Sequence, residues 1–365
     1  MKTQAKWTVL LLAVLFFGIS IACWVKPAGE YSVTERRKLE QFPKFTMETV
    51  GSGKFMTSFE DYTLDQFPMR DNFRSLKAWI SQNVFRKADN NDIYVADGYA
   101  VKMEYPLKEE ALDYAGKRFQ NIYDKYLKES GSNIYLSLIP DKNFFLAESS
   151  GHLSMDYGKL HEMMQKQMPY AQYIDITGLL DISDYYKTDV HWKQEKIVDV
   201  AEKIGQTMGI TLSGDYEINT LPQKFYGVYF GQSALNLPGE SMVYLTNDQI
   251  EQCEVFNYEN NQKTGVYDLK KAEGNDLYEV FLSGPVSLLK IENPNADTEK
   301  ELIVFRDSFG SSLIPLLAEG YKSIVLDVLN GDEEKAMIIP TFGEEVDDLT
   351  IKVSSDFFNF GKIME

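Results

Sequence analysis

Nineteen consecutive residues near the amino terminus, WTVLLLAVLFFGISIACWV, run from Trp7 to Val25 without a charge. At a rise of about 1.5 Å per residue, a helix of this length spans roughly the hydrocarbon core of a bilayer. Lys2 and Lys6 precede the run, and basic flanks tend to stay on the cytoplasmic side. The sequence therefore predicts a single-pass protein of the cell membrane, with residues 26–365 extracytoplasmic.

Two other interpretations of this segment stay open. A cleaved signal peptide has a shorter apolar region followed by small residues at the cleavage site, and ISIACW offers a poor site. The letters SIAC resemble a lipoprotein cleavage box, but Ser20 stands where a larger aliphatic residue is usual. We favour an uncleaved signal-anchor, with residues 1–28 forming the cytoplasmic tip and transmembrane helix.

The charge balance restricts the classes of partner. The chain carries 37 Lys and Arg against 55 Asp and Glu, a net charge of −18. Nucleic-acid binding needs clustered basic residues, so we expect no nucleic-acid partner. The same balance argues against a polybasic, lipid-binding surface. The chain is long enough for one large α/β domain or two smaller ones.

Cysteine and histidine usage argues against metal chemistry. Cys23 lies inside the apolar run and Cys253 far from it, so we expect no disulfide and no cysteine-based metal site. The three histidines, His152, His161 and His191, form no close pair of the metalloprotease type. No nucleotide-binding motif is recognisable. The sequence therefore predicts no metal and no cofactor.

Residues 29–90 predict a helical entry segment. The stretch KPAGEYSVTERRKLEQFPKFT is polar and contains two prolines, as expected of a membrane-proximal linker. Apolar residues then recur at helical spacing, first Phe55 and Phe59 and later Phe73 and Leu76. Because QFPMRD interrupts the pattern, we expect two helices around a proline turn.

Residues 91–365 alternate between strand and helix patterns, which predicts an α/β domain with a mostly parallel sheet flanked by helices. We expect strands at residues 133–139, 173–177, 301–305 and 322–329, and helices at residues 108–130, 154–168 and 194–209. We also expect a hairpin at residues 91–102 turning at Asp97-Gly98, and an antiparallel excursion over residues 211–300 that includes MVYLT and LYEVFL.

The strand at residues 301–305 leads directly into Arg306-Asp307-Ser308. In open α/β sheets, ligands bind outside the carboxyl ends of the strands. A serine in the turn before a helix exposes its hydroxyl beside free backbone N–H groups, which could stabilise an oxyanion. Ser308 is therefore a candidate nucleophile. The alternative is that Ser308 or Asp307 only caps the helix.

A serine nucleophile needs a neighbouring base that a carboxylate holds in the correct tautomer. The stretch KTDVHWKQ supplies Asp189 and His191, whereas His152 and His161 lack a positioned carboxylate motif. The alternative is a surface loop in which His191 and Trp192 pack together.

These residues carry a resemblance. The stretches YIDITGLLDISDYYKTDVHWKQE and LIVFRDSFGSSLIPLLAEGYKSIVLD resemble the DHHW family of bacterial surface proteins. That family is similar to the SGNH-hydrolase-like alginate O-acetylation proteins. The stretches SVTERRKLEQFPKFT, FEDYTLDQFPMRDNF, IYVADGYAV and IPDKNFF follow in the same order, so the resemblance covers nearly the whole chain after the apolar run.

The resemblance implies an SGNH-like extracytoplasmic domain at residues 91–365, with Ser308 as nucleophile, His191 as general base and Asp189 as its orienting partner. It further implies O-acetylation of an extracellular polysaccharide, or the matching acetylesterase activity. A membrane-bound O-acyltransferase is the implied donor partner, since nothing here can bring acetyl-CoA across a bilayer. The alternative is a non-catalytic glycan-binding or scaffold partner of such an acyltransferase.

The chain departs from the family pattern at two places. Val190 replaces the first histidine of the motif, which we expect to be tolerated because position 190 should point away from Asp189 and His191. Leu329 and Asn330 stand where the family often has Arg and Tyr, which would weaken activity if those residues assist catalysis.

Three further residues are candidates for substrate contact. Lys142 follows a strand end in PDK, and the alternative for it is a solvated loop lysine. Trp192 and Arg306 directly adjoin the proposed base and nucleophile segments.

Overall fold

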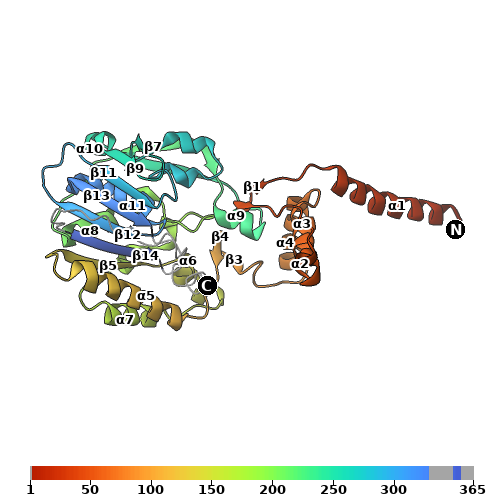
Figure 1. Ribbon diagram of the computed structural model, residues 1–365, viewed down its shortest axis with the longest axis horizontal. Coiled ribbons are helices and arrows are strands. Elements are labelled where there is room, and N and C mark those ends of the chain that lie inside the picture. The colour runs from red at the N-terminus through yellow and green to blue at the C-terminus, as the bar shows by residue number, and fades with distance from the viewer. Residues whose placement is uncertain (1, 329–347, 355–365) are drawn as a thin grey trace. The chain divides into compact units, whose positions relative to one another are not determined.

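The computed structural model describes residues 2–328 and 348–354 (Figure 1). The chain forms two compact units. The first comprises Met1–Asn91 with Val228–Leu237, and the second comprises Asp92–Gly227 with Pro238–Glu365.

The first unit begins with helix α1, Lys2–Val25. Within the described residues, this is the one helix long and apolar enough to cross a membrane, over Ala5–Val25. The predicted apolar N-terminal helix is thus present.

Short elements follow α1 in the first unit. Strands β1 (Tyr31–Ser32) and β2 (Arg37–Lys38) pair antiparallel. The helices are α2 (Met47–Gly51), α3 (Lys54–Asp65), α4 (Arg70–Asn83) and α9 (Val228–Ser233). Helix α2 begins at a capping box in which Thr46 and Thr49 exchange hydrogen bonds. The prediction of two helices around a proline turn is confirmed, since Pro68 separates α3 from α4.

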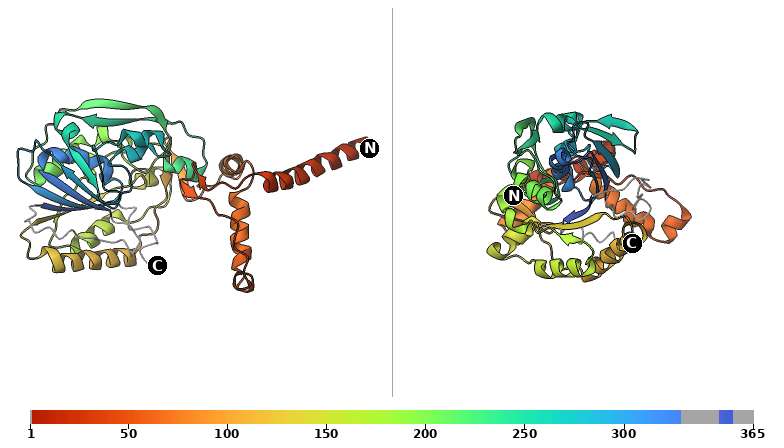
Figure 2. Two further views of the ribbon diagram at one scale, coloured as in Figure 1. Left: turned by 45° about the horizontal axis from the view of Figure 1, so that its top comes forward. Right: turned by 90° about the vertical axis from the view of Figure 1, so that its left-hand side faces the viewer.

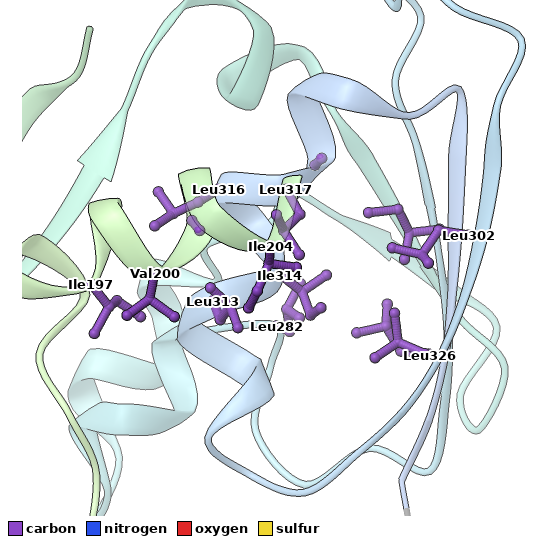
Figure 3. Close-up of a cluster of buried hydrophobic side chains, with 14 of the residues drawn as sticks. Ile197, Val200, Ile204, Leu282, Leu302, Leu313, Ile314, Leu316, Leu317 and Leu326 are labelled. Atoms are coloured by element: carbon purple, nitrogen blue, oxygen red, sulfur yellow. The ribbon is translucent and has the colours of Figure 1, made fainter. Parts of the chain in front are cut away.

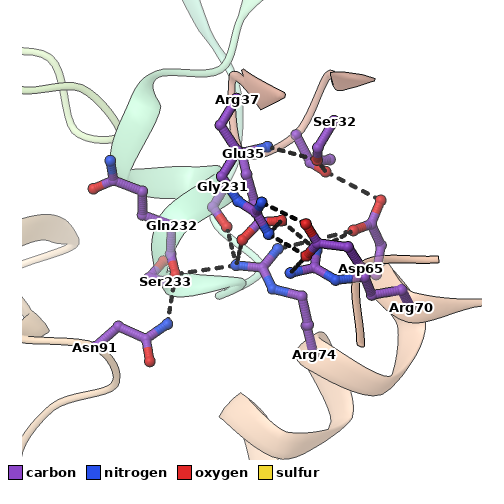
Figure 4. A network of polar contacts seen from close by, with 12 residues as sticks. Ser32, Glu35, Arg37, Asp65, Arg70, Arg74, Asn91, Gly231, Gln232 and Ser233 are labelled. Carbon is purple, nitrogen blue, oxygen red and sulfur yellow. Dashed lines mark hydrogen bonds and ion pairs between the residues drawn. The ribbon is translucent and has the colours of Figure 1, made fainter. Parts of the chain in front are cut away.

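An ion-pair network joins β2, α3 and α4 (Figure 4). The Arg37 guanidinium donates two hydrogen bonds to Asp65, at 2.5 and 2.8 Å. Glu35 pairs with Arg70 and, at 3.3 Å, with Arg74. Arg37 lowers the pKa of Asp65, outweighing the effect of burial. Burial alone would raise the pKa of Glu35, but the neighbouring arginines hold it below its ordinary value.

The second unit is built on an eight-stranded sheet with the order β10-β9-β11-β13-β12-β14-β5-β6. Strands β13 to β6 in this order run parallel, whereas β10, β9 and β11 form an antiparallel edge. The sheet is mixed, so the predicted mostly parallel sheet is not confirmed. The strands are β5 (Asn133–Ile139), β6 (Gln172–Tyr173), β9 (Glu254–Asn257), β10 (Gln262–Thr264), β11 (Leu288–Glu292), β12 (Glu301–Arg306), β13 (Ser323–Val328) and β14 (Asp348–Ser354).

Helices cover both faces of this sheet (Figures 1 and 2). Alternate residues of β12 belong to different apolar clusters, because successive side chains of a strand point to opposite faces. Leu302 and Val304 join α8 (Val198–Thr207) and α11 (Gly310–Leu317) in one cluster (Figure 3). Ile303 and Phe305 join the other cluster, with α5 (Glu109–Ile122) and α7 (Tyr157–Gln167). The remaining helices of this unit are α6 (Lys142–Ser150) and α10 (Asp248–Gln252).

The antiparallel elements test the sequence predictions most closely. The hairpin of β3 (Ile93–Ala96) and β4 (Tyr99–Lys102) turns at Asp97-Gly98, where both residues have positive φ, as predicted. The ribbon of β7 (Glu217–Phe225) and β8 (Glu240–Thr246) contains the predicted strand MVYLT. The predicted strand LYEVFL is wrong: Leu277–Val280 form a 3-10 helix, because the side chain of Asp276 caps it at the N–H of Tyr278.

Candidate active site

The segment from Tyr185 to Trp192 forms a tight hairpin-like loop. These two residues make an antiparallel bridge, and the N–H of Tyr186 donates to the carbonyl of His191 at 3.0 Å. The Asp189 carboxylate at the tip accepts a hydrogen bond from the backbone N–H of His191 at 3.1 Å. The loop thereby presents Asp189 and His191 together.

The three residues expected to do chemistry lie in one hydrogen-bonded chain. Asp189 Oδ1 lies 2.5 Å from His191 Nδ1, and His191 Nε2 lies 2.7 Å from Ser308 Oγ. Because a carboxylate only accepts, Nδ1 carries the proton and Nε2 is free to accept one from Ser308. Asp189 and His191 are buried, whereas Ser308 is exposed. Solvent and substrate can therefore reach the Ser308 end of the hydrogen-bonded chain but not the Asp189 carboxylate.

Ser308 lies in the turn between β12 and α11. The carboxylate of Asp307 accepts from the N–H of Phe309 at 3.0 Å, within the turn, while the Ser308 hydroxyl points to His191. Among the described residues, no side chain caps α11, so the alternative that Ser308 or Asp307 only caps the helix is wrong. A Cβ on Gly310 would come within 2.7 Å of the Arg306 side chain. The turn therefore needs a glycine at that position.

An aromatic ring holds His191 from one side. Tyr278 stacks on the imidazole with ring centroids 3.8 Å apart and an 8° interplanar angle. The Tyr278 hydroxyl lies 2.8 Å from Ser312 Oγ, and burial raises the pKa of this phenol, which keeps it neutral. The sequence prediction missed Tyr278 because its surroundings were assigned to a strand.

Trp192 is fully buried in this structure. Its indole N–H donates to Ser312 Oγ at 2.9 Å and to the Phe309 carbonyl at 3.2 Å. Trp192 connects the His191 loop to the helix that follows Ser308, and substrate contact by Trp192 stays a prediction that its burial does not favour.

Lys142 is also buried, so the alternative of a solvated loop lysine is wrong. Its ammonium donates to the backbone carbonyls of Tyr186 and Lys187, at 3.0 and 3.4 Å. Unpaired buried carbonyls are costly, so this contact fixes the start of the loop that carries Asp189. The geometry gives Lys142 a positioning contact and does not provide an exposed surface for substrate.

Arg306 is 1% exposed. Its Nη1 donates to Ser311 Oγ at 2.7 Å and to the Asp307 carbonyl at 3.2 Å. Within the described chain, Nε and Nη2 of this buried guanidinium have no hydrogen-bond partner. Burial lowers the pKa of Arg306 to about 10. Substrate contact by Arg306 stays a prediction that its present burial does not favour.

The remaining residues named in the sequence analysis either make packing contacts or lie outside the described residues. His152 stacks on Tyr94, and His161 contacts Tyr173. Val190 packs against the main apolar cluster. Leu329 and Asn330 lie outside the described residues.

Both cysteines are free. Burial raises the pKa of the Cys253 thiol to about 12, which makes it an unreactive thiol. In the part of the chain that the structure describes, no group of three or more His, Cys, Asp and Glu could hold a metal ion.

Gly227 packs directly against the Asp189 backbone. A Cβ at this position would lie 2.2 Å from Asp189 Cβ and 2.4 Å from both Asp189 Cα and the Thr188 carbonyl. We expect Gly227→Ala to displace Asp189 and to lower kcat for acetyl-ester cleavage by roughly 10- to 100-fold, because small misplacements of catalytic groups are costly. We also expect a loss of about 1–3 kcal/mol in unfolding free energy from overpacking.

The matched control for this prediction is Gly178→Ala, since a Cβ at Gly178 would have no heavy atom within 4 Å beyond its two chain neighbours. Steady-state kinetics and thermal melts of both variants measure the effect. If Gly227→Ala behaves like Gly178→Ala, the close packing against Asp189 is not important for the site.

No protein-family model matches the sequence, and no curated protein matches it. Solved structures do match. Bacillus cereus PatB1 with a sulfonyl adduct is similar at a TM-score of 0.57 and 17% identity, covering 74% of this chain and 96% of that one. A DHHW family protein from Eubacterium siraeum is similar at a TM-score of 0.51 and 15% identity, covering 76% and 94%.

The expected resemblance to the DHHW family is thus confirmed by a solved structure from that family, at the level of the fold. The O-acetyltransferase domain of Pseudomonas putida AlgJ matches at a TM-score of 0.45 and 11% identity, covering 73% of this chain and 92% of that domain, which is too low to support an argument.

Proposed function

We propose that the chain transfers an acetyl group to a hydroxyl of an extracellular polysaccharide, through an SGNH-like triad of Ser308, His191 and Asp189. The observation that carries the proposal is the hydrogen-bonded chain from the exposed Ser308 hydroxyl through His191 to the buried Asp189. This is the arrangement that activates a serine hydroxyl at neutral pH. The fold shared with PatB1, a protein solved with a sulfonyl adduct, supports a reactive nucleophile.

In the first half-reaction, Ser308 Oγ attacks the carbonyl carbon of an acetyl ester while His191 Nε2 takes the hydroxyl proton. Asp189 stabilises the imidazolium that forms, and the tetrahedral intermediate collapses as His191 returns the proton to the departing donor oxygen. The products are the donor alcohol and acetylated Ser308. Among the described residues, the N–H of Ser308 has no hydrogen-bond acceptor, which makes it the candidate donor to the oxyanion.

In the second half-reaction, a sugar hydroxyl attacks the acetyl carbonyl. His191 takes its proton and gives it to Ser308 Oγ as the serine ester breaks. The same steps with water in place of the sugar give an acetylesterase. The two activities therefore share every residue of the triad and differ in the acceptor that reaches it.

The proposal includes a location and a partner. We propose that α1 anchors the chain in the cell membrane, that residues 29–90 act as the entry segment, and that residues 91–365 form the extracytoplasmic SGNH-like domain. An acetyl donor is then needed outside the membrane. A membrane-bound O-acyltransferase that exports acetyl groups would supply it.

The test is intact-mass analysis of the full-length protein in detergent after exposure to an activated acetyl ester. We expect an acetyl adduct on Ser308 in the wild type. We expect none at position 308 in the variants Ser308→Ala and His191→Ala. Added oligosaccharide acceptors then separate transfer from hydrolysis. If no donor labels the wild type, and a small sulfonyl fluoride does not either, the catalytic proposal fails and a glycan-binding or scaffold role takes its place.

A further inference from the structure

The helices between residues 47 and 83 have an unusual distribution of polarity. None of the described side chains of α2 is buried, and within α3 the buried residue is the charged Asp65. Helix α4 buries Ala78 and Ser81. The contacts that hold α3 and α4 in the first unit are largely ionic, made by Glu35 and Asp65 with the arginines described above. Polar groups therefore occupy the interior of this region.

Large apolar side chains occupy its outside. On α4, Phe73, Leu76 and Trp79 follow one another at three-residue intervals and are 46%, 52% and 57% exposed. We call these three residues the α4 stripe. An amphipathic helix normally turns such a stripe toward a core, and the stripe here is turned away from the side that carries Ala78 and Ser81.

A second apolar surface is formed by α3 together with residues 42–45, which precede α2. Five rings pack against one another with centroids 5.3–6.4 Å apart. We call this group the aromatic cluster: Phe42, Phe45, Phe55, Phe59 and Tyr62. Phe42 is 57% exposed and Phe45 is 72% exposed, so residues 2–328 and 348–354 leave this side of the cluster uncovered. Exposed apolar surfaces of this kind mark contact sites for membranes or proteins.

The short linker after α1 favours a contact with the membrane over a contact with another protein. Sixteen residues separate Val25, the last residue of α1, from Phe42. At about 3.5 Å per residue, they reach at most about 60 Å, so an anchored α1 keeps the aromatic cluster within reach of the bilayer surface.

The charge of residues 26–91 also favours a membrane contact. Residues 26–91 carry 11 Lys and Arg against 9 Asp and Glu, whereas residues 92–365 carry 24 against 46. The strongly acidic balance of the chain is therefore absent from this segment. Lys77, Arg86 and Lys87 accompany the apolar residues, and a combination of Trp, Phe and basic residues is typical of helices that lie in the membrane interface.

We infer that the α4 stripe and the aromatic cluster lie in the interfacial zone of the bilayer that α1 crosses. This inference rests on the proposed membrane anchoring of the chain. It assigns α3 and α4 a second, shallow membrane contact beyond the span itself. This placement explains the reversed polarity of the region: the apolar faces pack against lipid, and the arginine–carboxylate pairs stay within the protein.

Tryptophan quenching in vesicles tests the inference on the full chain. The variant Trp7→Phe/Trp24→Phe leaves Trp79 on the stripe and Trp192, which is fully buried. Adding Trp79→Phe gives the background from Trp192. In vesicles of phosphatidylcholine and phosphatidylglycerol, we expect shallowly brominated phosphatidylcholine to lower the Trp79 emission by about twofold, with little quenching by aqueous acrylamide. In the variant that lacks Trp7, Trp24 and Trp79, Phe45→Trp reports on the aromatic cluster in the same way.

Two results would overturn the inference. Quenching of Trp79 by acrylamide without an effect of brominated lipid means that the stripe faces water. Protection from both quenchers means that a protein surface, such as a second copy or the acyltransferase, covers it. A separate variant, Trp79→Phe alone, keeps Trp7 and Trp24 as reporters of the span. Quenching of these two residues by brominated lipid shows that the anchor stands even if the interfacial contact fails.

Discussion

Ser308→Ala is expected to lower kcat/KM for acetyl-ester cleavage by roughly 10⁴- to 10⁶-fold, as triad enzymes lose when the nucleophile is removed. The physical reason is that His191 Nε2, 2.7 Å from Ser308 Oγ, then has no hydroxyl to deprotonate. The fold should be retained, because Ser308 is exposed and its side chain does not cap α11. Initial rates with an activated acetyl ester and a thermal melt measure both effects.

An exposed serine outside the site serves as the control for this variant. Ser149 lies on α6, and its hydroxyl donates to the Leu146 carbonyl within the same helix. Ser149→Ala should match the wild type in rate and stability. If Ser308→Ala instead keeps more than a tenth of the wild-type rate while remaining folded, Ser308 is not the nucleophile.

Asp189→Asn is expected to lower kcat by roughly 10⁴-fold at neutral pH. An amide has no negative charge, so it no longer stabilises the imidazolium that forms when His191 accepts a proton. If the amide nitrogen faces Nδ1, which now lies 2.5 Å from Asp189 Oδ1, it donates to that atom and moves the ring proton to Nε2. The proton then points at Ser308 and blocks the base. Rates measured across pH detect both effects.

The control for this substitution is Asp175→Asn, because Asp175 is exposed and accepts only a local hydrogen bond from the N–H of Thr177 in the contacts described. Its rate should stay within about twofold of the wild type, as for surface changes that disturb no special contact. A loss of less than tenfold in Asp189→Asn would mean that the carboxylate orients the loop through the His191 N–H alone and does not assist proton transfer.

The sequence predicted the parallel strands β5, β12 and β13 well, but it did not predict β14, and the strand predicted at residues 173–177 is only Gln172–Tyr173 in the structure. The runs NIYLSLI and ELIVF are nearly continuously apolar because both faces of β5 and β12 are buried, and such runs have few alternative structures. The prediction was wrong at Leu277–Val280, where alternation of side chains suggested a strand. There a capping aspartate and the packing of Tyr278 on His191 decide the conformation, and both depend on contacts distant in sequence.

In the candidate site, too, the sequence predicted some residues and missed the contacts that support them. Asp189, His191 and Ser308 could be identified because their residue types and local spacing carry chemical meaning. The support around them could not. Lys142 and Trp192 looked like exposed polar or aromatic residues beside a site, but they are buried and connect segments 44 or more residues apart. Only the tertiary structure brings such partners together.

The α4 stripe shows what periodicity leaves undecided. The spacing of Phe73 and Leu76 predicted a helix with an apolar face, and α4 is that helix. Periodicity does not specify what covers the face, because a protein core and a lipid surface favour the same side chains.

The position of β14 in the sheet bears on how the chain folds as it is synthesised. Strand β14 lies between β12 and β5, so the two halves of the sheet pair through it. It is also the last of the described strands to leave the ribosome, since chains emerge amino terminus first. Until it arrives, β12 and β5 each present an open edge, and open edges invite pairing with other chains. Completion of the sheet therefore waits until residues 348–354 have emerged, and products that stop before residue 348 should aggregate rather than fold.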